Sequence, residues 1–288
     1  MPELNVGSVH TVRADLHSHS IFSDGTMAPG DVARRAAEHG VELYALTDHD
    51  EVSGLAEASA AANACAMAFV AGVEISVTWG ATTLHIVGLG VDGDDGALRD
   101  GLARVRSGRT RRAREISDGL AAAGIEGAFE GALRHAENPQ MIGRTHFARF
   151  LVEKGVCRDV REVFKRYMVE SKPGYVPYRW ATLGEAVDMI TAAGGVSVLA
   201  HPARYRLDSL ALHELLKEFR GLGGTAIEVV TSNHTRDDVR HFTQLALDFG
   251  FEASSGSDFH GPGESENVEL GRVAALAPEL TPVWHRFV

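Results

Sequence analysis

The segment with the clearest potential for chemistry lies near the N-terminus, where two histidines are separated by a single residue. Asp24 follows five residues after the second member of the pair His17 and His19. In an extended strand, residues i and i+2 point to the same face, so both imidazoles can reach one point at the end of the strand. Imidazole together with carboxylate favours Zn, Mn or Fe, whereas Ca and Mg prefer shells of oxygen alone. Two surface histidines at a strand end are the simpler alternative, because a His-x-His pair alone is a weak signal.

Six more histidine, aspartate and glutamate residues occur in similar contexts downstream. Most of them lie at or just beyond the C-terminal end of a predicted strand, which is where barrels of parallel strands build their active sites. His85 is an exception, since it lies near the start of its strand. Nine potential ligands exceed what one tetrahedral site uses, so we expect two or three metal ions. The six additional candidates are His49, Glu74, His85, His201, Asp258 and His260.

Seven short apolar segments are predicted to be strands, and most of them alternate with helical patterns. This alternation is typical of parallel βαβ units. We therefore expect an α/β fold with a distorted, TIM-like barrel of seven strands, and an open doubly wound sheet is the competing architecture. The expected strands cover residues 12–17, 41–47, 68–75, 84–91, 196–200, 226–230 and 252–255.

The alternation of strands and helices stops at the loop formed by residues 92–96. Residues 97–168 show helical patterns only, and residues 171–177 have the composition of a linker. We therefore predict that residues 97–171 form an inserted helical cap. Residues 1–96 and 172–288 would form the metal-binding barrel.

Composition narrows the class of protein. The chain has 288 residues, of which 44% are hydrophobic, and a formal net charge of −11. An acidic protein is a poor general nucleic-acid binder, although bound metal ions can reverse the charge locally and admit a nucleotide or a short oligonucleotide.

Cys65 and Cys157 form no Cys-x-x-Cys motif, which fits a reducing cytoplasm. Without a signal-peptide pattern or an apolar run long enough to span a membrane, the sequence predicts a cytoplasmic protein.

Taken together, the motifs resemble those of the PHP (polymerase and histidinol phosphatase) family of metal-dependent phosphoesterases. The resemblance covers the whole α/β part of the chain and implies a distorted seven-stranded barrel that holds a cluster of two or three metals. The long helical insertion after the fourth strand resembles the TrpH- or YciV-like subgroup, some of whose members dephosphorylate nucleotides or degrade short RNA. The matching pieces are Asp15-Leu-His-Ser-His19, Thr47-Asp-His-Asp50, Gly72-Val-Glu74, His85, Ala200-His-Pro202 and Ser257-Asp-Phe-His260.

The resemblance also implies how the nine residues divide among the metals. His17, His19, Glu74 and Asp258 would hold the first ion; Asp24, His49 and His260 the second; and the bridging Glu74, with His85 and His201, the third. Mixed nitrogen and oxygen ligation suits divalent Mn, Fe or Zn, and we expect Mn. A hydroxide that bridges two ions would then attack phosphorus, so no protein nucleophile is required. Asp50 or His201 is a candidate for protonating the leaving oxygen.

Residues outside the metal set must select the substrate. The insertion carries arginines 104, 106, 109, 111, 112 and 114 on one predicted helix, and a solvated basic face is the simpler interpretation for most of them. Arg144 and His146 match an Arg-x-His that the subgroup resemblance implies at this place, and Lys172 lies in the linker. Ser20 and Ser23 could donate to phosphate or cap a turn. The full set of candidate contacts is Ser20, Asp24, Arg104, His135, Arg144, His146, Lys172, His234 and His260.

Cations placed above an acidic metal site suggest a substrate with a second anionic group. We therefore expect a phosphatase that acts on a 3′,5′-nucleotide bisphosphate such as adenosine 3′,5′-bisphosphate (pAp). The alternatives are a 5′→3′ exonuclease on short RNA, a histidinol phosphatase and a non-catalytic module stabilised by metal. The sequence lacks the aromatic and basic pattern of a long single-strand channel, so we expect a small nucleotide and neither long nucleic acid nor membrane as a partner. His10, His39, His213, His241 and His285 are expected to be structural or surface residues.

Overall fold

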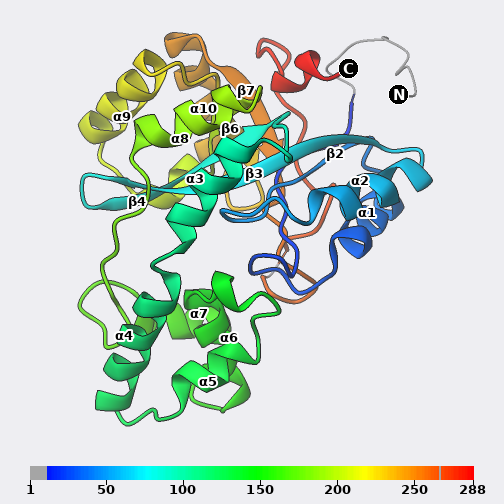
Figure 1. Cartoon of the computed structure of the whole chain (residues 1–288). Coiled ribbons are helices and arrows are strands. Elements are labelled where there is room, and N and C mark those ends of the chain that lie inside the picture. The colour runs from blue at the N-terminus through cyan, green and yellow to red at the C-terminus, as the bar shows by residue number, and fades with distance from the viewer. Residues whose placement is uncertain (1–11, 266) are drawn as a thin grey trace.

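In the computed structural model, which describes residues 12–265 and 267–288, seven strands form one sheet in which each strand pairs with the next along the chain (Figure 1). The first and last strands approach each other, because the Leu16 N–H donates to the Ser255 carbonyl at 3.0 Å and Ser18 bridges Phe259. The sheet is therefore nearly closed, which confirms the distorted barrel over the open doubly wound sheet. His10 lies outside the described residues. The strands are β1 (Ala14–Asp15), β2 (Leu43–Leu46), β3 (Ala68–Trp79), β4 (Thr82–Leu89), β5 (Val196–Leu199), β6 (Ala226–Thr231) and β7 (Glu252–Gly256).

The pairing of β4 differs from the parallel βαβ units that the alternation of strands and helices predicts. β3 continues to Trp79, beyond its expected end at residue 75, and then turns back through Gly80, whose φ of +57° suits a tight turn. β4 consequently runs antiparallel to both β3 and β5, whereas the remaining pairs are parallel. An antiparallel strand begins at the edge where its neighbours end. This reversal explains why His85 can join residues from the C-terminal ends of other strands.

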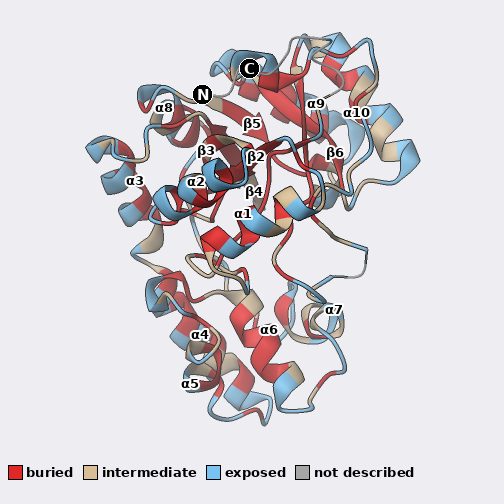
Figure 2. Cartoon of the chain, turned by 90° about the vertical axis from the view of Figure 1, so that its right-hand side faces the viewer, coloured by how far each residue is buried: buried red, intermediate tan, exposed pale blue. Residues whose placement is uncertain are grey.

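Among the described residues, five α-helices outside the segment between β4 and residue 183 pack on the outside of the barrel, and their buried apolar residues join those of the strands in one core (Figure 2). The expected capping box at the start of one helix is present: Thr182 Oγ1 accepts from the Glu185 N–H at 3.2 Å, and the Glu185 carboxylate accepts from the Thr182 N–H at 2.7 Å. No helix among the described residues is long and apolar enough to cross a membrane. These helices are α1 (Pro29–Glu38), α2 (Leu55–Ala64), α8 (Leu183–Ala192), α9 (Ser209–Gly221) and α10 (Arg236–Phe249).

The residues between β4 and α8 are mainly helical and build a second hydrophobic core. Leu98, Leu102 and Val105 of α3 still pack with the barrel, while the second core begins at Ala113 of α4. We call residues 109–168, which contain this second core, the helical lobe. Figure 1 shows the helical lobe in green below the barrel. The division of the chain at residues 97 and 171 remains a prediction. The helices in this region are α3 (Gly96–Arg106), α4 (Arg109–Ala122), α5 (Ala128–Leu133), α6 (Arg144–Glu153) and α7 (Val160–Val163).

Candidate metal centre and substrate pocket

The two histidines of the first motif lie just after β1 and point to the same place, as their spacing predicts. Their Nε2 atoms are 3.2 Å apart, and both side chains are completely buried. The end of β7 passes very close to this segment. A Cβ built on Gly256 would lie 2.3 Å from the Cβ of His17, so only glycine allows this approach. The end of β7 at Gly256 is therefore in close contact with His17.

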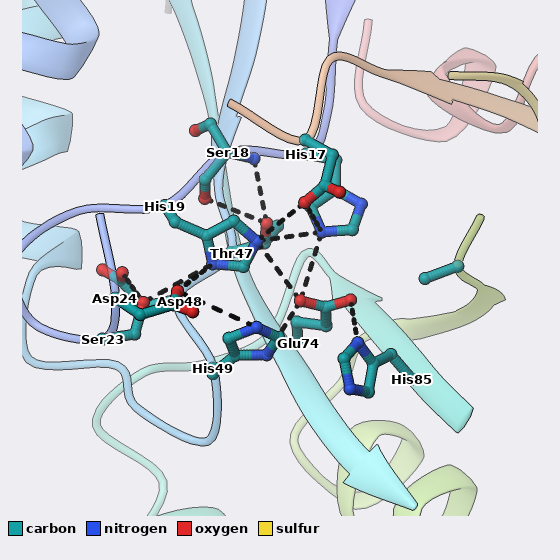
Figure 3. A network of polar contacts seen from close by, with 12 residues as sticks. His17, Ser18, His19, Ser23, Asp24, Thr47, Asp48, His49, Glu74 and His85 are labelled. Carbon is teal, nitrogen blue, oxygen red and sulfur yellow. Dashed lines mark hydrogen bonds and ion pairs between the residues drawn. The ribbon is translucent and has the colours of Figure 1, made fainter. Parts of the chain in front are cut away.

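Glu74 on β3 is the centre of the arrangement (Figure 3). Its Oε2 atom lies 3.3 Å from Nε2 of both His17 and His19, and 2.9 Å from Nδ1 of His49. Its Oε1 atom lies 2.9 Å from Nδ1 of His85 and 3.0 Å from Nε2 of His201. One carboxylate thus faces five imidazoles that come from four different strands or their loops.

The remaining three candidates complete the cluster from the loops after β1 and β7. Asp24 Oδ1 lies 3.3 Å from Nε2 of His260 and 3.9 Å from Nε2 of His49. Asp258 Oδ1 lies 3.2 Å from Nε2 of His19. The structure therefore brings all nine expected residues together at one end of the barrel. Potential ligand atoms lie within 4.8 Å of one another in three overlapping groups: His19, Asp24, His49 and His260; His17, His19 and Glu74; and His49, Glu74 and His85.

Several buried atoms of this cluster lack the hydrogen bonds that buried polar atoms normally make. Asp24 Oδ1, Glu74 Oε2 and His49 Nδ1 are buried and make no hydrogen bond among the described residues; the last two lie 2.9 Å apart, but without the geometry of a hydrogen bond. An unsatisfied buried polar group costs about 1–3 kcal/mol, and more when it is charged. Divalent cations would satisfy these atoms, and the mixture of imidazole and carboxylate suits a transition metal. The residues present therefore fit a cluster of divalent metal ions.

The charges in the cluster shift each other's pKa values in opposite directions. Burial disfavours charge on His17, but the carboxylates of Glu228, Glu74 and Asp258 outweigh burial and raise its pKa. Burial acts in the same way on His19, while hydrogen bonds to Asp258 and Glu74 raise its pKa to about 10. Burial would raise the pKa of Glu74, yet the surrounding histidines hold it well below its usual range. In the absence of metal His17 and His19 consequently bind protons, which metal ions would displace on binding.

Sequence reasoning missed Glu228, which lies on β6 and is buried. Its Oε1 atom lies 2.7 Å from Nδ1 of His17, and its Oε2 atom accepts the backbone N–H of His201 at 2.6 Å. His201 is in a left-handed conformation with φ of +28°, which is uncommon for a residue with a side chain. Glu228 therefore orients two of the nine candidates. A single carboxylate within the apolar run of β6 was the signal in the sequence.

Ser20 and Ser23, which follow the histidine pair, both donate hydrogen bonds to Asp48, and of the two only Ser23 also lines the pocket described below. The Asp48 carboxylate accepts two hydrogen bonds from Ser20, from the backbone N–H at 2.7 Å and from the hydroxyl at 2.6 Å. It also accepts the hydroxyl of Ser23 at 2.5 Å. Ser20 is fully buried and also accepts the N–H of Phe22 at 3.2 Å. The expected contact between Ser20 and phosphate is thus not supported, because its hydroxyl fixes the turn that follows His19.

A pocket of about 210 Å³ lies above the cluster, between the barrel and the helical lobe. Asp24, His49, His85 and His260 line its barrel side. The lobe side carries three arginines, and we call Arg109, Arg112 and Arg144 the arginine wall. The interpretation of residues 109 and 112 as part of a solvated face on one helix is wrong. The helix is interrupted before Arg109, and both arginines are about 8% exposed because they occupy the inward stripe of α4.

The arginines of this wall are held by aromatic rings and by few acids. Arg109 lies 4.6 Å from the ring centre of Trp180 and pairs with Asp50, whereas Arg112 lies 5.3 Å from the same ring centre. Burial, followed by repulsion from Arg144 and Arg109, lowers the pKa of Arg112 to about 9. Within the described residues, no carboxylate lies within ion-pair distance of Arg112 or Arg144. Arg112 and Arg144 therefore lack the anionic partner that Arg109 has in Asp50, and an anionic ligand would supply it.

Asp50 has a different role from the one expected of it. Its Oδ1 accepts the Ser76 N–H at 2.8 Å, and its Oδ2 accepts the Ser76 hydroxyl and the Arg109 guanidinium. Both oxygens are thus engaged, and the residue is fully buried. Asp50 therefore anchors Arg109 to the barrel and is not free to protonate a leaving group.

Five further expected substrate contacts do not line the central pocket. Arg104 is exposed and lines a separate cavity with Tyr178 and Arg179. His135 pairs with Glu153 at 2.8 Å, and Lys172 is exposed in the linker. Nδ1 of His234 lies 2.9 Å from the Val229 carbonyl, and His146 accepts the Gly143 N–H at 3.1 Å. We therefore retain Asp24, Arg144 and His260 from the expected set.

The chain matches known proteins over most of its length. The family model for the PHP domain matches residues 15–168. A 3′,5′-nucleoside bisphosphate phosphatase of Chromobacterium violaceum is 48% identical over 270 residues, which cover 94% of each protein. The 5′-3′ exoribonuclease Rnm of Escherichia coli is 39% identical over 96% of this chain and 94% of its own length. A solved structure of a C. violaceum amidohydrolase with bound sulfate and no metal superposes with a TM-score of 0.92, at 48% identity and with 95% of each chain covered.

Proposed function

Because the chain belongs to the PHP domain family, we propose that it is a metal-dependent phosphatase that releases phosphate from a 3′,5′-nucleotide bisphosphate such as pAp. The observation that carries this proposal is the two-sided pocket, with candidate metal ligands on one side and the arginine wall on the other. The 48% identical relative named as a 3′,5′-nucleoside bisphosphate phosphatase supports the same substrate class.

We assign the metal ligands in three sets, of which the first and the third share Glu74. His17, His19, Glu74 and Asp258 would hold one ion, Asp24, His49 and His260 a second, and Glu74, His85 and His201 a third. The distances around Glu74 and its unsatisfied oxygen support this assignment. Bound divalent ions, of which Mn is our choice, would lower the pKa of water and neutralise phosphoryl oxygens.

The protein residues around these ions would position the substrate for the reaction. Glu228 keeps the Nδ1 atom of His17 occupied, so its Nε2 atom remains directed at the cluster. Arg144 and Arg112 would bind the phosphate that is not cleaved, since a guanidinium can bind phosphate through two parallel hydrogen bonds. Met141, Phe164 and Trp180 also line the pocket and offer apolar surface to the nucleoside.

The direct test is phosphate release from four substrates compared side by side, with the protein loaded with Mn²⁺. The substrates are pAp, AMP, histidinol phosphate and a 5′-phosphorylated RNA trimer. We expect rapid release from pAp and slow release from AMP and histidinol phosphate, because only pAp engages both sides of the pocket. Equal rates on AMP and pAp would show that the arginine wall does not recognise a second phosphate.

Exonuclease activity on short RNA is the second candidate, and the identity of the chain to exoribonucleases supports it. The relative from Haemophilus influenzae, named as a 5′-3′ exoribonuclease, is 36% identical over 96% of this chain. A 5′-phosphorylated trimer also carries several phosphates that could span the pocket. Mononucleotides released from the trimer faster than phosphate is released from pAp would favour this candidate over the bisphosphate phosphatase.

A further inference from the structure

One helix of the helical lobe, α6, contacts a candidate ligand of the metal centre directly. The apolar side of α6 contributes Phe147 and Leu151 to the core of the lobe. Thr145 and Arg149 are four positions apart, so they lie on a common side of the helix. This side faces the two loops that carry Asp24 and His260. The lobe and the barrel thus meet at the loops that hold candidate ligands.

Both residues on this side of α6 hold Asp24 directly. The Thr145 hydroxyl donates to Asp24 Oδ2 at 2.9 Å, and the Arg149 guanidinium donates to the Asp24 backbone carbonyl at 2.5 Å. Asp24 Oδ1 makes no hydrogen bond and faces His260 and His49. One oxygen of the carboxylate is thus fixed by the lobe, while the other is left for the group of histidines.

Arg149 also connects this loop with the loop that follows β7. Its side chain is about 9% exposed and pairs with Glu264 at 2.9 Å, four residues after His260. The two loops are joined independently, because the Thr26 N–H donates to the His260 carbonyl at 2.8 Å. α6 therefore holds both loops at once and fixes Asp24 relative to His260.

From these contacts we infer that α6 positions Asp24 for metal binding, with Thr145 and Arg149 as positioning residues for the ion held by Asp24, His49 and His260. This inference rests on the metal centre of the proposed function. It adds that the helical lobe controls metal affinity as well as covering the substrate. Partners that orient metal ligands typically change metal affinity about 10- to 100-fold when they are removed.

The test is a titration of the metal-free protein with Mn²⁺, with free Mn²⁺ measured by electron paramagnetic resonance. Thr145→Val keeps the shape of the side chain and removes the hydroxyl, whereas Thr145→Ser keeps the hydroxyl. Thr110→Val is a matched control, because Thr110 is an exposed residue of α4 in the same lobe. Thermal unfolding of each metal-free variant separates a local change from loss of the fold.

We expect Thr145→Val to weaken one class of Mn²⁺ site about tenfold or more, while Thr145→Ser and Thr110→Val titrate like the wild type. An unchanged titration of Thr145→Val, or an equal loss in Thr145→Ser, would overturn the positioning role and leave the proposed function intact. Absence of Mn²⁺ binding by the wild type would overturn the metal-dependent function together with this inference. Arg149→Met provides a second variant, for which we expect weakening of the same site class.

Discussion

The two sides of the central pocket are built in opposite ways. On the barrel side, histidines and carboxylates come from strand ends and contact one another, and Glu74 alone faces five imidazoles. On the lobe side, Arg112 and Arg144 lie on helices against aromatic rings, with no acidic partner among the described residues. The side chains on the barrel side can therefore bind cations, and those on the lobe side can bind anions. A substrate with two phosphates satisfies both sides, one phosphate through bound metal and the other directly.

We expect the largest effect when the charge of Glu74, at the centre of the barrel side, is removed. Glu74→Gln keeps the size of the side chain but removes the charge that two of the three proposed ligand sets share. We expect loss of more than one Mn²⁺ ion per chain and a decrease in kcat of about a thousandfold or more. Metal analysis after dialysis and steady-state phosphate release provide the two measurements. Glu214→Gln on the exposed face of α9 is the control, and equal metal content in both variants would contradict the bridging role of Glu74.

A smaller effect is expected when the support behind the ligands is weakened. Glu228→Gln removes the carboxylate at 2.7 Å from Nδ1 of His17 but keeps an oxygen that can accept the His201 N–H. We expect Mn²⁺ affinity to fall about 10- to 100-fold, with activity recovered at high Mn²⁺. Titration of the metal-free variant measures this loss. If activity stayed low at saturating Mn²⁺ despite normal binding, Glu228 would act on the reaction itself and not on the ligands.

The smallest effect concerns stability on the lobe side. Burial, followed by the charges of Arg149 and Arg109, lowers the pKa of His146 to about 4, against the pull of Asp24. Between pH 6.5 and 4 the unfolded chain therefore binds more protons at this residue than the folded chain. The free energy of unfolding should fall as the pH falls through this window, by at most about 3 kcal/mol, and level off below it.

His146→Gln isolates this contribution, because glutamine can accept the Gly143 N–H without titrating. Urea denaturation of both metal-free proteins at pH 7.5 and pH 4.5 gives the comparison. We expect the variant to lose less stability than the wild type between the two pH values. Equal losses would mean that folding does not lower the pKa of His146.

The same contrast explains what the sequence could predict. The metal ligands followed from His, Asp and Glu at the ends of apolar strands, and strand ends meet in a barrel whatever the details of pairing. The local sequence pattern does not encode strand direction, so the antiparallel β4 was not predicted; the turn at Gly80, between Trp79 and Thr82, produces it. Arg109 and Arg112 were missed because charged helical residues are usually solvated. Their register with Ala113 and Ile116 is the evidence that could have revealed their burial.

The most direct test of the two-sided pocket compares two substrates in one lobe variant. Arg144→Ala removes an anion contact of the lobe side without touching the metal ligands. We expect kcat/KM for pAp to fall about 10- to 100-fold, the equivalent of losing a hydrogen bond to a charged group, while kcat/KM for p-nitrophenyl phosphate changes less than about threefold. A similar decrease for both substrates, or no decrease for pAp, would contradict a second phosphate on the arginine wall.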